Sequence, residues 1–500
     1  MDKKSRNKKM KVIVIGGGPA GVTAAMRARE LGAEVTIVER GRMGGTCTND
    51  GCVPTRVLAK AARLLRDSAQ YESYGLSGVQ PTLNFGSLMR RVQQVVYTMH
   101  EKKQLIQRLE QAGVKVIAQA GEARFTDPST LSLPDRRNLI ADRFILCAGG
   151  RARRLDFPGE ELALTHSQIW MLKDLPRSMV VVGAAATGCQ LASIFASFGV
   201  LVTLLEVAPR ILAMEDEVVS DEVSAGFRRQ GIVVHTGIGG IQRLEKVSPD
   251  GRLLRLHLQD TDRARTLEAE AVVLSTGWLG NLDGLNLAAA GVKKRGNYVW
   301  VDDSLRTTDP HIYAAGDITG RMMLVQSAGS EALVAAENAV LDGNLRLDHR
   351  VTPHGGFTDP EYASVGLTEE QARQEGLAYT AAVVPFSELD RAVIDGQPSG
   401  VCKLMVSNEN HRILGVHVAG EQALEVVHLV AAGITAGMWV EQLAEMEIAY
   451  PTFAAVVGLA ARKIVQELGV RPVAPQWRAL GRSPDAEWEK SATGNDFRNV

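Results

Sequence analysis

Two cysteines five positions apart, Cys47 and Cys52, are the residues with the most distinctive chemistry in this 500-residue sequence. They lie in segment 44–54, shortly after a glycine-rich segment that begins at Gly16. A structural zinc site needs four ligands, and the sequence has no second Cys/His cluster nearby. A cysteine pair that cycles between disulfide and dithiol beside a dinucleotide is an electron relay. The two segments together predict a flavin next to a redox-active dithiol.

The glycine-rich segment has the order of elements that dinucleotide binding requires. Residues 11–15 predict a strand, a helix follows to about Leu31, and residues 34–38 predict a second strand. Glycines let the backbone approach a pyrophosphate, and the helix N-terminus supplies N–H donors and a positive dipole end. Glu39 ends the second strand, 23 positions after Gly16, where an acidic residue binds a ribose hydroxyl. The candidates for binding in this unit are Gly16, Gly18, Pro19, Ala20, Gly21 and Glu39.

The same pattern recurs later in the chain. Residues 180–182 predict a strand, a helix follows to Phe198, and a further strand ends at Glu206. Glu206 again lies 23 positions after the first glycine of the unit, and Gly183 and Gly188 are its candidate binding glycines. Ala185 stands where the middle glycine is expected, so we expect a less close approach to the phosphates and weaker binding. Two such units predict two dinucleotides.

Glu206 also bears on which reduced coenzyme binds. A carboxylate favours two free ribose hydroxyls and repels a 2′-phosphate, which arginines would bind. The sequence therefore favours NADH, although Arg210 is close enough to leave room for NADPH.

The overall composition excludes several classes of protein. A formal net charge of −1 argues against a general nucleic-acid or membrane-surface binder. The basic start, residues 1–10, has no apolar core or cleavage site of a secretory signal, and we expect a solvated tail. Residues 178–205 carry no charged side chain, but glycines interrupt them, and we interpret them as buried parallel strands around a helix rather than a membrane span. Cys147, Cys189 and Cys402 are expected to be buried thiols, which suits a reducing compartment and a cytoplasmic protein.

The remaining chain predicts one long helix and a different C-terminal module. Residues 84–111 have apolar side chains at helical spacing. After about residue 350 the sequence changes to strands (402–406 and 413–418) and helices (421–436), and from about Val470 we expect an unstructured tail. The fold class is α/β, with two Rossmann-like dinucleotide-binding domains and a C-terminal α+β domain. The expected boundaries are 1–10 for the tail, 11–155 with 285–350 for the FAD-binding domain, 156–284 for the NAD(P)-binding domain, 351–470 for the dimerisation domain and 471–500 for the second tail.

Three further motifs support a family resemblance. They are Ala148-Gly149-Gly150, the segment 308–317 that ends in Ala315-Gly316-Asp317, and segment 356–360 with 364–369. With the cysteine segment, they make residues 10–470 resemble the class I pyridine nucleotide–disulfide oxidoreductases, which include dihydrolipoamide dehydrogenase, glutathione reductase and mercuric reductase.

The resemblance implies a homodimer with bound FAD, in which NAD(P)H reduces the flavin and the flavin reduces a Cys47–Cys52 disulfide. By position, Cys52 would be the flavin-proximal, charge-transfer thiol and Cys47 the interchange thiol that meets the acceptor. Asp317 would bind the ribityl chain of the flavin. The further cofactor-binding candidates carried by the resemblance are Gly45, Thr46, Arg56, Gly121, Ala148, Gly149, Gln190, Gly277 and Gly316.

The departures from the family pattern bear on the acceptor. Members that reduce disulfides carry a histidine, oriented by a glutamate, where this chain has Tyr450 and Ala455. A tyrosine with a pKa near ~10 is a poor general base, although it can donate a proton or touch a metal. The family's lysine near the flavin is Arg56 and its glutamate partner is Gln190, which makes the surroundings more positive. Ala186 replaces an aromatic residue over the nicotinamide pocket.

These features favour an FAD-dependent NAD(P)H oxidoreductase that acts through Cys47–Cys52 on a disulfide or thiol-bound acceptor. Mercuric reductases also carry a tyrosine at the position of Tyr450, which makes soft-metal reduction the first competing function. Against this, no cysteine follows Cys402, whereas those enzymes use a C-terminal cysteine pair. A diaphorase, oxidase or transhydrogenase that uses the flavin directly also fits, as does a non-enzymatic component of a larger complex. No resident metal is expected.

Overall fold

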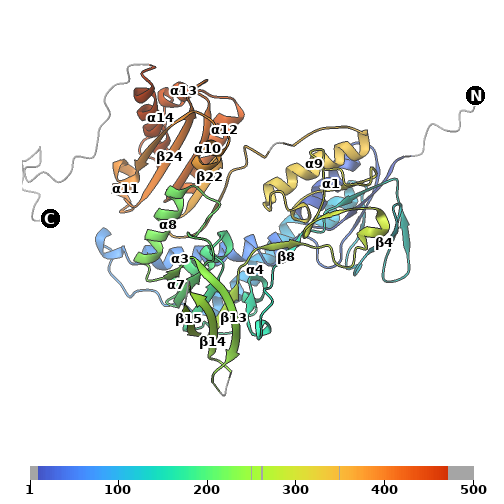
Figure 1. The fold of residues 1–500 in the computed structure, drawn as a ribbon, viewed down its shortest axis with the longest axis horizontal. Coiled ribbons are helices and arrows are strands. Elements are labelled where there is room, and N and C mark those ends of the chain that lie inside the picture. The colour runs from blue at the N-terminus through green and yellow to red at the C-terminus, as the bar shows by residue number, and fades with distance from the viewer. Residues whose placement is uncertain (1–8, 249–250, 261–262, 348, 471–500) are drawn as a thin grey trace, which may run out of the picture.

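The structure is a computed structural model that describes residues 9–248, 251–260, 263–347 and 349–470. The expected N-terminal tail, up to residue 8, and the expected C-terminal tail after residue 470 lie outside these residues. The described chain contains two units, each built on a parallel sheet, and a C-terminal part built on an antiparallel sheet (Figure 1). Helices connect these parts.

The first unit is a five-stranded parallel sheet with the order β20-β7-β1-β2-β3. Its central strands are buried, so they are apolar on both faces, as expected for a parallel sheet covered by helices. Helices α1 (Pro19–Glu30) and α9 (Val325–Leu341) lie side by side against it (Figure 1). The strands are β1 (Lys11–Ile15), β2 (Glu34–Val38), β3 (Lys115–Ile117), β7 (Arg143–Leu146) and β20 (Ile312–Ala314). The predicted strands 11–15 and 34–38 and the helix between them are confirmed.

The second unit repeats this topology, with the strand order β12-β11-β10-β16-β9, again all parallel. Its helix α7 (Ala186–Ser197) occupies the place of α1, and α8 (Glu217–Arg229) precedes β12. The strands are β9 (Leu164–Thr165), β10 (Ser178–Val182), β11 (Leu201–Leu205), β12 (Val233–His235) and β16 (Ala271–Leu274). The predicted second strand–helix–strand unit is therefore confirmed.

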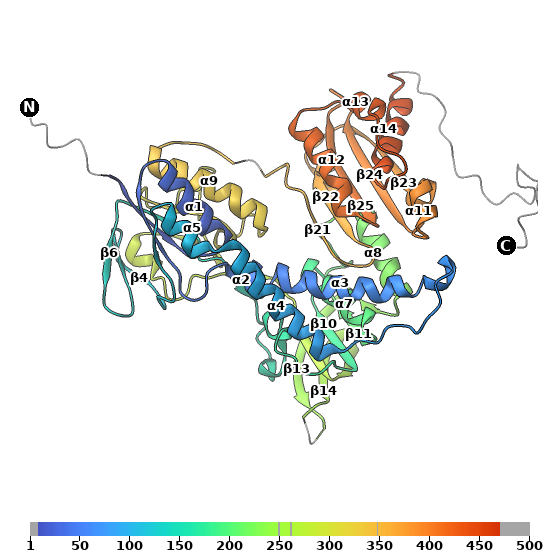
Figure 2. The same ribbon diagram turned by 180° about the vertical axis from the view of Figure 1, so that it is seen from behind.

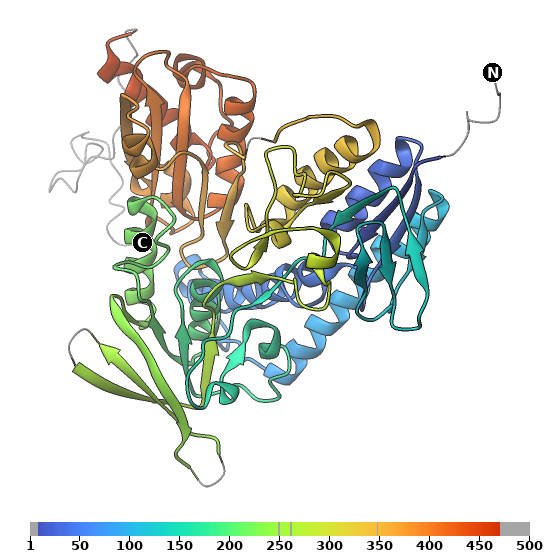
Figure 3. The same ribbon diagram turned by 45° about the vertical axis from the view of Figure 1, so that its right-hand side comes forward.

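Each unit also has a small antiparallel sheet, inserted before the later strand that pairs with its central strand (β7 beside β1, and β16 beside β10). In the first unit it is formed by β4 (Arg124–Asp127), β5 (Thr130–Ser132) and β6 (Asn138–Ile140). In the second it is longer and projects from the molecule (Figure 3), and consists of β13 (Ile238–Lys246), β14 (Leu254–Asp260) and β15 (Arg263–Ala269). Strands β8 (Gly150–Ala152) and β17 (Trp278–Gly280) pair antiparallel where the chain passes between the two units.

Four helices follow the first two strands: α2 (Gly45–Asn49), α3 (Cys52–Ser68), α4 (Phe85–Lys103) and α5 (Leu105–Gln111). The single helix predicted over residues 84–111 is wrong, because Gln104 adopts a left-handed conformation (φ 42°) and ends α4. The turn redirects α5 so that Leu109 is fully buried in the core of the first unit. The helical spacing of apolar residues continues across Gln104, so the sequence pattern gave no sign that the helix ends there.

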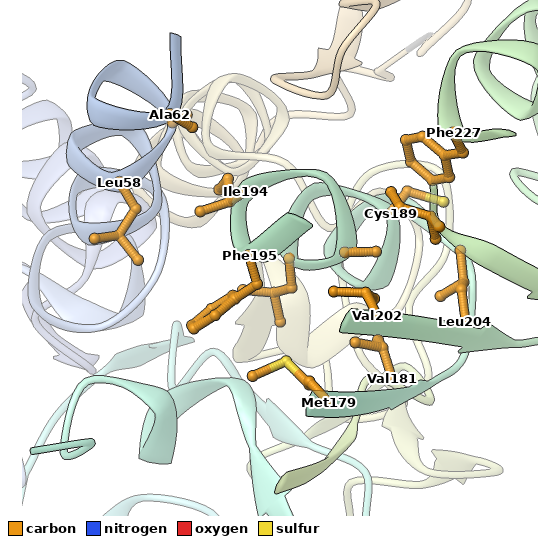
Figure 4. Close-up of a cluster of buried hydrophobic side chains, with 14 of the residues drawn as sticks. Leu58, Ala62, Met179, Val181, Cys189, Ile194, Phe195, Val202, Leu204 and Phe227 are labelled. Carbon is orange, nitrogen blue, oxygen red and sulfur yellow. The ribbon is translucent and has the colours of Figure 1, made fainter. Parts of the chain in front are cut away.

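Helix α3 connects the two units through apolar packing. Figure 4 shows Leu58 and Ala62 of α3 on one side and Ile194 and Phe195 of α7 on the other. All four side chains are almost completely buried. The helix that carries Cys52 is thereby fixed to the second unit as well as to the first.

The C-terminal part is a five-stranded antiparallel sheet with the order β21-β22-β25-β24-β23. Its strands are β21 (His354–Gly356), β22 (Tyr362–Gly366), β23 (Tyr379–Pro385), β24 (Gly400–Ser407) and β25 (Ile413–Gly420). The helices are α10 (Glu369–Gln374), α11 (Asp390–Ile394), α12 (Ala423–Thr435), α13 (Val440–Glu445) and α14 (Ala455–Leu468). The strands and helix predicted for this part are confirmed, and no helix in the described residues is long and apolar enough to cross a membrane.

Candidate functional site

The two cysteines lie on consecutive helices. Cys47 is in the short α2, and Cys52 is the first residue of the seventeen-residue α3 (Figure 2). All five cysteines are free thiols in the structure, and the thiols of Cys47 and Cys52 are hydrogen-bonded to each other. The predicted buried thiols Cys147, Cys189 and Cys402 are buried, and burial raises the pKa of each. Only the Cys47–Cys52 pair is therefore suited to redox chemistry among the cysteines.

The two thiols of the pair differ in acidity. The hydrogen bond from the Cys47 thiol lowers the pKa of Cys52 to about 7, against the effect of burial. The same hydrogen bond, together with burial, raises the pKa of Cys47. The start of α3 also favours negative charge on Cys52, since the first N–H groups of a helix are unpaired and its dipole is positive there. Cys52 is therefore the thiol of the pair that ionises first, and Cys47 the one that keeps its proton.

The turn between the cysteines is held from outside. Asp50 accepts a hydrogen bond from the Ser167 hydroxyl (2.7 Å) through its carboxylate. Its backbone carbonyl accepts one from the Trp170 indole (2.7 Å). Ser167 belongs to α6 (His166–Ile169), directly after the last strand of the second unit in the sheet order. The second unit thus fixes the spacing between the two sulfurs.

The FAD-binding candidates come from three segments, which meet at glycines. The contacts between these segments are too close for larger side chains. A Cβ on Gly45 would lie 2.8 Å from the Gly18 Cα, and a Cβ on Gly316 would lie 3.2 Å from the Ala20 Cβ. Gly16, at φ 111°, packs against the carbonyl of Cys147. Glycines at these contacts leave a bare backbone cradle at the N-terminus of α1, which suits a pyrophosphate. The residues present therefore fit a bound FAD.

Two carboxylates flank this cradle. Glu39 accepts hydrogen bonds from the backbone N–H of Gly17 (2.6 Å) and of Gly41 (2.7 Å), which orients it at the end of β2. Burial, and next the nearby Glu331, raise the pKa of Asp317 to about 6. Asp317 lies against Gly150, so segment 308–317 contacts the motif Ala148-Gly149-Gly150. The remaining candidates of this unit lie in the same segments or at their ends: Pro19 and Gly21 in α1, Thr46 in α2 and Gly121 after β3.

The second unit has the same construction. Gly183, at φ 98°, packs against the carbonyl of Ser275, and a Cβ on Gly188 would lie 1.8 Å from the Gly183 carbonyl oxygen. Glu206 accepts hydrogen bonds from the backbone N–H of Ala184 (2.6 Å) and Ala208 (2.9 Å). Gly277, at φ 102°, follows strand β16. The NAD(P)H candidates therefore surround one loop at the N-terminus of α7.

Arg56 and Gln190, the two departures expected beside the flavin, meet at a third residue that the sequence did not single out. The Arg56 guanidinium lies 3.9 Å from the ring centroid of Phe357. The Gln190 side chain accepts a hydrogen bond from the Phe357 backbone N–H (3.2 Å). An arginine stacks on an aromatic ring better than a lysine does, and a neutral amide suffices to accept this N–H. Both residues therefore pack on Phe357, which belongs to segment 356–360.

A cavity of about 220 Å³ adjoins this contact where α3, α8 and segment 357–361 meet. Its charges are largely paired across these parts: Arg63 with Glu421, and Arg66 with Asp359 at 3.1 Å. Both pairs join α3 to the C-terminal part of the chain.

Tyr450 lies in the C-terminal part, between α13 and α14, with 77% of its surface exposed. Its hydroxyl donates a hydrogen bond to the Asp390 carboxylate (2.8 Å), which raises the pKa of Tyr450. The residue therefore remains protonated at neutral pH. Within the described residues, no hydrogen bond joins it to either cysteine. Asp390 lies sixty positions away in sequence, and no sequence pattern indicated it.

Comparison with known proteins identifies the class. Residues 10–332 match the pyridine nucleotide-disulphide oxidoreductase family, and residues 352–461 match its dimerisation domain. The chain belongs to this family, and it is an FAD-dependent disulfide oxidoreductase that uses NAD(P)H. The resemblance inferred from the motifs and the α/β fold class are both confirmed.

Individual relatives include two enzymes with different acceptors. The mercuric reductase of Lysinibacillus sphaericus is 32% identical over 453 residues, which cover 90% of this chain and 82% of that protein. The dihydrolipoyl dehydrogenase of Bacillus subtilis (strain 168) is 31% identical over 433 residues, which cover 83% and 90%. The solved structure of LpdA from Mycobacterium tuberculosis superposes with a TM-score of 0.81 at 25% identity, over 91% of this chain and 99% of that one. Similarity of this degree to both enzymes does not distinguish between their acceptors.

The described residues contain no group of three or more His, Cys, Asp or Glu side chains arranged to hold a metal ion. The chemically active parts of the site are the dithiol and the two nucleotide cradles.

Proposed function

We propose that electrons leave this enzyme through the Cys47–Cys52 pair to a disulfide or to another acceptor bound through thiol sulfur. The carrying observation is the geometry of the pair: two free thiols on the consecutive helices α2 and α3, with the turn between them held through Asp50. A thiolate at Cys52, fixed at the start of α3, is suited to face the flavin. A protonated Cys47 on the short α2 is suited to exchange with an acceptor, because it becomes a nucleophile when its proton leaves.

FAD, when bound, accepts hydride from NAD(P)H and reduces the disulfide. The protein residues orient the partners of that transfer. Glu39 and Asp317 hold the FAD side, and Glu206 holds the coenzyme side, for which we propose a preference for NADH. Arg56 supplies a positive charge on the α3 face, held in place by the Phe357 ring.

The protein acts as a homodimer in this proposal. It carries the family's dimerisation domain, and within the described residues Tyr450 has no hydrogen bond to the cysteines of its own chain. In the proposed dimer, Tyr450 acts at the dithiol of the partner subunit. The buried free thiols Cys147, Cys189 and Cys402 support a reducing compartment, and we place the enzyme in the cytoplasm.

Soft-metal reduction is the second candidate, favoured by the Tyr450–Asp390 hydrogen bond. Because the Tyr450 proton is directed to Asp390, the lone pairs of the phenol oxygen remain available to accept a hydrogen bond or to contact a metal. The similarity to a mercuric reductase supports this candidate.

An anaerobic titration with NADH and with NADPH tests the proposal. Electron relay through the dithiol predicts four electrons taken up per FAD, and a long-wavelength absorbance from the Cys52 thiolate beside the flavin. Cys52→Ser should remove that absorbance and leave two electrons per FAD. Uptake of only two electrons per FAD by the unmodified enzyme, without the long-wavelength thiolate absorbance, would exclude a redox-active pair.

The pH dependence gives a second readout. Because the pKa of Cys52 is lowered to about 7, the thiolate absorbance of the reduced enzyme should grow as pH rises through about 7 and should be nearly absent at pH 5. A midpoint near the ordinary thiol value would contradict the hydrogen-bonded pair.

A steady-state panel then separates the acceptors: lipoamide, glutathione disulfide, Hg(II) with excess thiol, quinone and oxygen. Turnover that needs both cysteines, with a disulfide, supports the proposal. Hg(II)-dependent turnover that is sensitive to Tyr450→Phe supports the second candidate. Full quinone or oxygen activity in the Cys47→Ser variant would show that the flavin reacts directly.

A further inference from the structure

The last turn of α4 contacts the residues that follow Cys47. The Lys103 ammonium donates a hydrogen bond to the Thr48 hydroxyl (2.8 Å). One turn earlier, the His100 ring Nε2 lies 2.8 Å from the Asn49 side-chain oxygen. A five-residue helix such as α2 has little stability of its own, so these two contacts fix the position of the Cys47 segment.

The contact is tightly packed. Thr48 is buried, with 1% of its surface exposed. A Cβ on Gly44 would lie 3.2 Å from the Thr48 Cβ and 3.4 Å from the His100 Cε1. The nineteen-residue α4 therefore determines where the Lys103 charge lies relative to α2.

The charge of Lys103 acts on both sulfurs. It lowers the pKa of Cys47 and of Cys52, whereas the Asp317 carboxylate raises both. The C-terminal end of α4 is the negative end of its dipole, which by itself would disfavour a thiolate nearby. A lysine in this turn reverses the sign of that field.

We propose that Lys103 is a positioning residue of the dithiol, which holds the Cys47 segment through Thr48 and supplies positive charge beside the two sulfurs from within the same chain. The inference rests on the proposed role of the Cys47–Cys52 pair and names a residue that supports it.

The chemistry explains why this charge is needed. Two electrons break the S–S bond and leave two negative charges on the sulfurs, and one proton from solvent converts Cys47 to a thiol. Before Cys47 can attack an acceptor, that proton must return to solvent or to the acceptor. Tyr450 is a poor base for this step, because it is protonated at neutral pH. A fixed ammonium favours the thiolate without taking the proton.

The test measures how readily Cys47 ionises, without any acceptor or coenzyme. In a Cys52→Ser background, the FAD-loaded enzyme is alkylated with iodoacetamide across a pH series, and the peptide that contains Cys47 is quantified. Lys103→Gln keeps a donor for Thr48 but removes the charge, and should raise the alkylation midpoint by about half a pH unit. Lys103→Arg should restore the original midpoint.

Lys102→Gln is the matched control, because it removes the same charge one position away on an exposed side chain. It should leave the midpoint unchanged. Equal shifts for both glutamine variants, or no shift for Lys103→Gln, would overturn the proposal.

Thr48→Val gives an independent variant if Lys103→Gln does not retain FAD. Valine matches threonine in shape but cannot accept the ammonium hydrogen bond, so the midpoint should move in the same direction by a smaller amount. An unchanged Thr48→Val midpoint would then overturn the proposal. The alkylation results remain readable even if the electron count excludes a redox-active disulfide, so the two proposals fail separately.

Discussion

The two dinucleotide units of this chain have the same backbone at their nucleotide loops. The first loop begins with a hydrogen bond from the Gly16 N–H to the Val38 carbonyl, and the second with one from Gly183 to Leu205, both at 2.8 Å. Helix α1 begins after Gly18 at φ −77° and ψ −174°, and α7 begins after Ala185 at φ −77° and ψ −175°. An alanine therefore adopts the conformation of the middle glycine without strain.

The two units differ in what lies next to that position. Gly18 faces Gly45 of the cysteine segment at backbone contact distance, whereas Ala185 is exposed. An added Cβ on Gly18 would lie at ordinary contact distance from the Gly45 Cα (3.6 Å), whereas a Cβ on Gly45 would lie 2.8 Å from the Gly18 Cα, so the close approach requires glycine at Gly45 and leaves little free space at Gly18. In the second unit no cysteine segment packs on the loop, and a methyl group is accommodated.

The same topology serves a different task in each unit. The fifth strand of the first sheet, β20, comes from beyond the second unit, so it returns Gly316 and Asp317 to the FAD cradle. The fifth strand of the second sheet, β9, precedes that unit and leads directly into α6, which holds the turn between the cysteines. In each sheet, the segment that follows the fifth strand therefore carries residues of the site: Gly316 and Asp317 after β20, and α6 after β9.

The largest effects are expected at the first glycine of each loop. A Cβ at Gly16 would lie 2.1 Å from the Cys147 carbonyl oxygen, and one at Gly183 would lie 2.4 Å from that of Ser275, both with φ near 100°. Each alanine substitution should cost on the order of 3 kcal/mol at its own loop. Gly16→Ala should purify without FAD. Gly183→Ala should retain FAD and a reducible dithiol, but its KM for NADH should rise by about a hundredfold.

Absorbance of bound FAD and steady-state kinetics check this pair. Gly199→Ala is a control, since Gly199 has positive φ but no atom within contact distance of an added Cβ. If Gly183→Ala released FAD as readily as Gly16→Ala, the two units would not be separable, and the contrast between them would fail.

Local patterns in the sequence were sufficient to predict the elements of both units. Apolar runs next to glycine-rich loops gave strands 11–15 and 34–38 at their observed bounds, and the strand expected to end at Glu206 ends one residue earlier, at Leu205. The pattern failed at Gln104, because a left-handed turn with a polar side chain leaves the apolar spacing nearly intact. The small antiparallel sheets were not predicted, since their strands are short and partly exposed.

The site was predictable only where its residues lie close in sequence. The cysteine segment and both acids follow recognisable glycine loops, so their types and spacing indicated their chemistry. Phe357, Asp390 and Lys103 act through contacts with residues far along the chain, which no spacing rule reaches. The contacts of Arg56 and Gln190 with Phe357 likewise join residues far apart in the chain and could not be predicted from the sequence.

The acids give effects of intermediate size. Glu206→Ala leaves the N–H groups of Ala184 and Ala208 without their acceptor and removes the carboxylate for which we propose a ribose contact. The KM for NADH should rise about tenfold to thirtyfold, corresponding to about 1.5–2 kcal/mol, while that for NADPH should rise less. Glu39→Ala should instead lower FAD occupancy and leave the KM for NADH unchanged in the fraction that holds FAD. Kinetics with both coenzymes measure this, and an equal loss for NADH and NADPH would argue against a ribose contact at Glu206.

The smallest expected effect is the most direct test of the difference between the loops. Ala185→Gly removes a methyl group from an exposed position of the second loop, so it should let the coenzyme phosphates approach more closely and lower the KM for NADH about threefold, or about 0.6 kcal/mol. The reverse change, Gly18→Ala, fits the protein itself, since its Cβ would lie at ordinary contact distance (3.6 Å) from the Gly45 Cα, but it should lower FAD affinity because it adds a methyl group to the loop proposed to approach the pyrophosphate. Steady-state NADH kinetics and FAD dissociation measure the two changes. A higher KM for Ala185→Gly would contradict this explanation. It would mean that the alanine improves binding by making the loop less flexible, and that the space next to the loop does not determine whether it carries glycine or alanine.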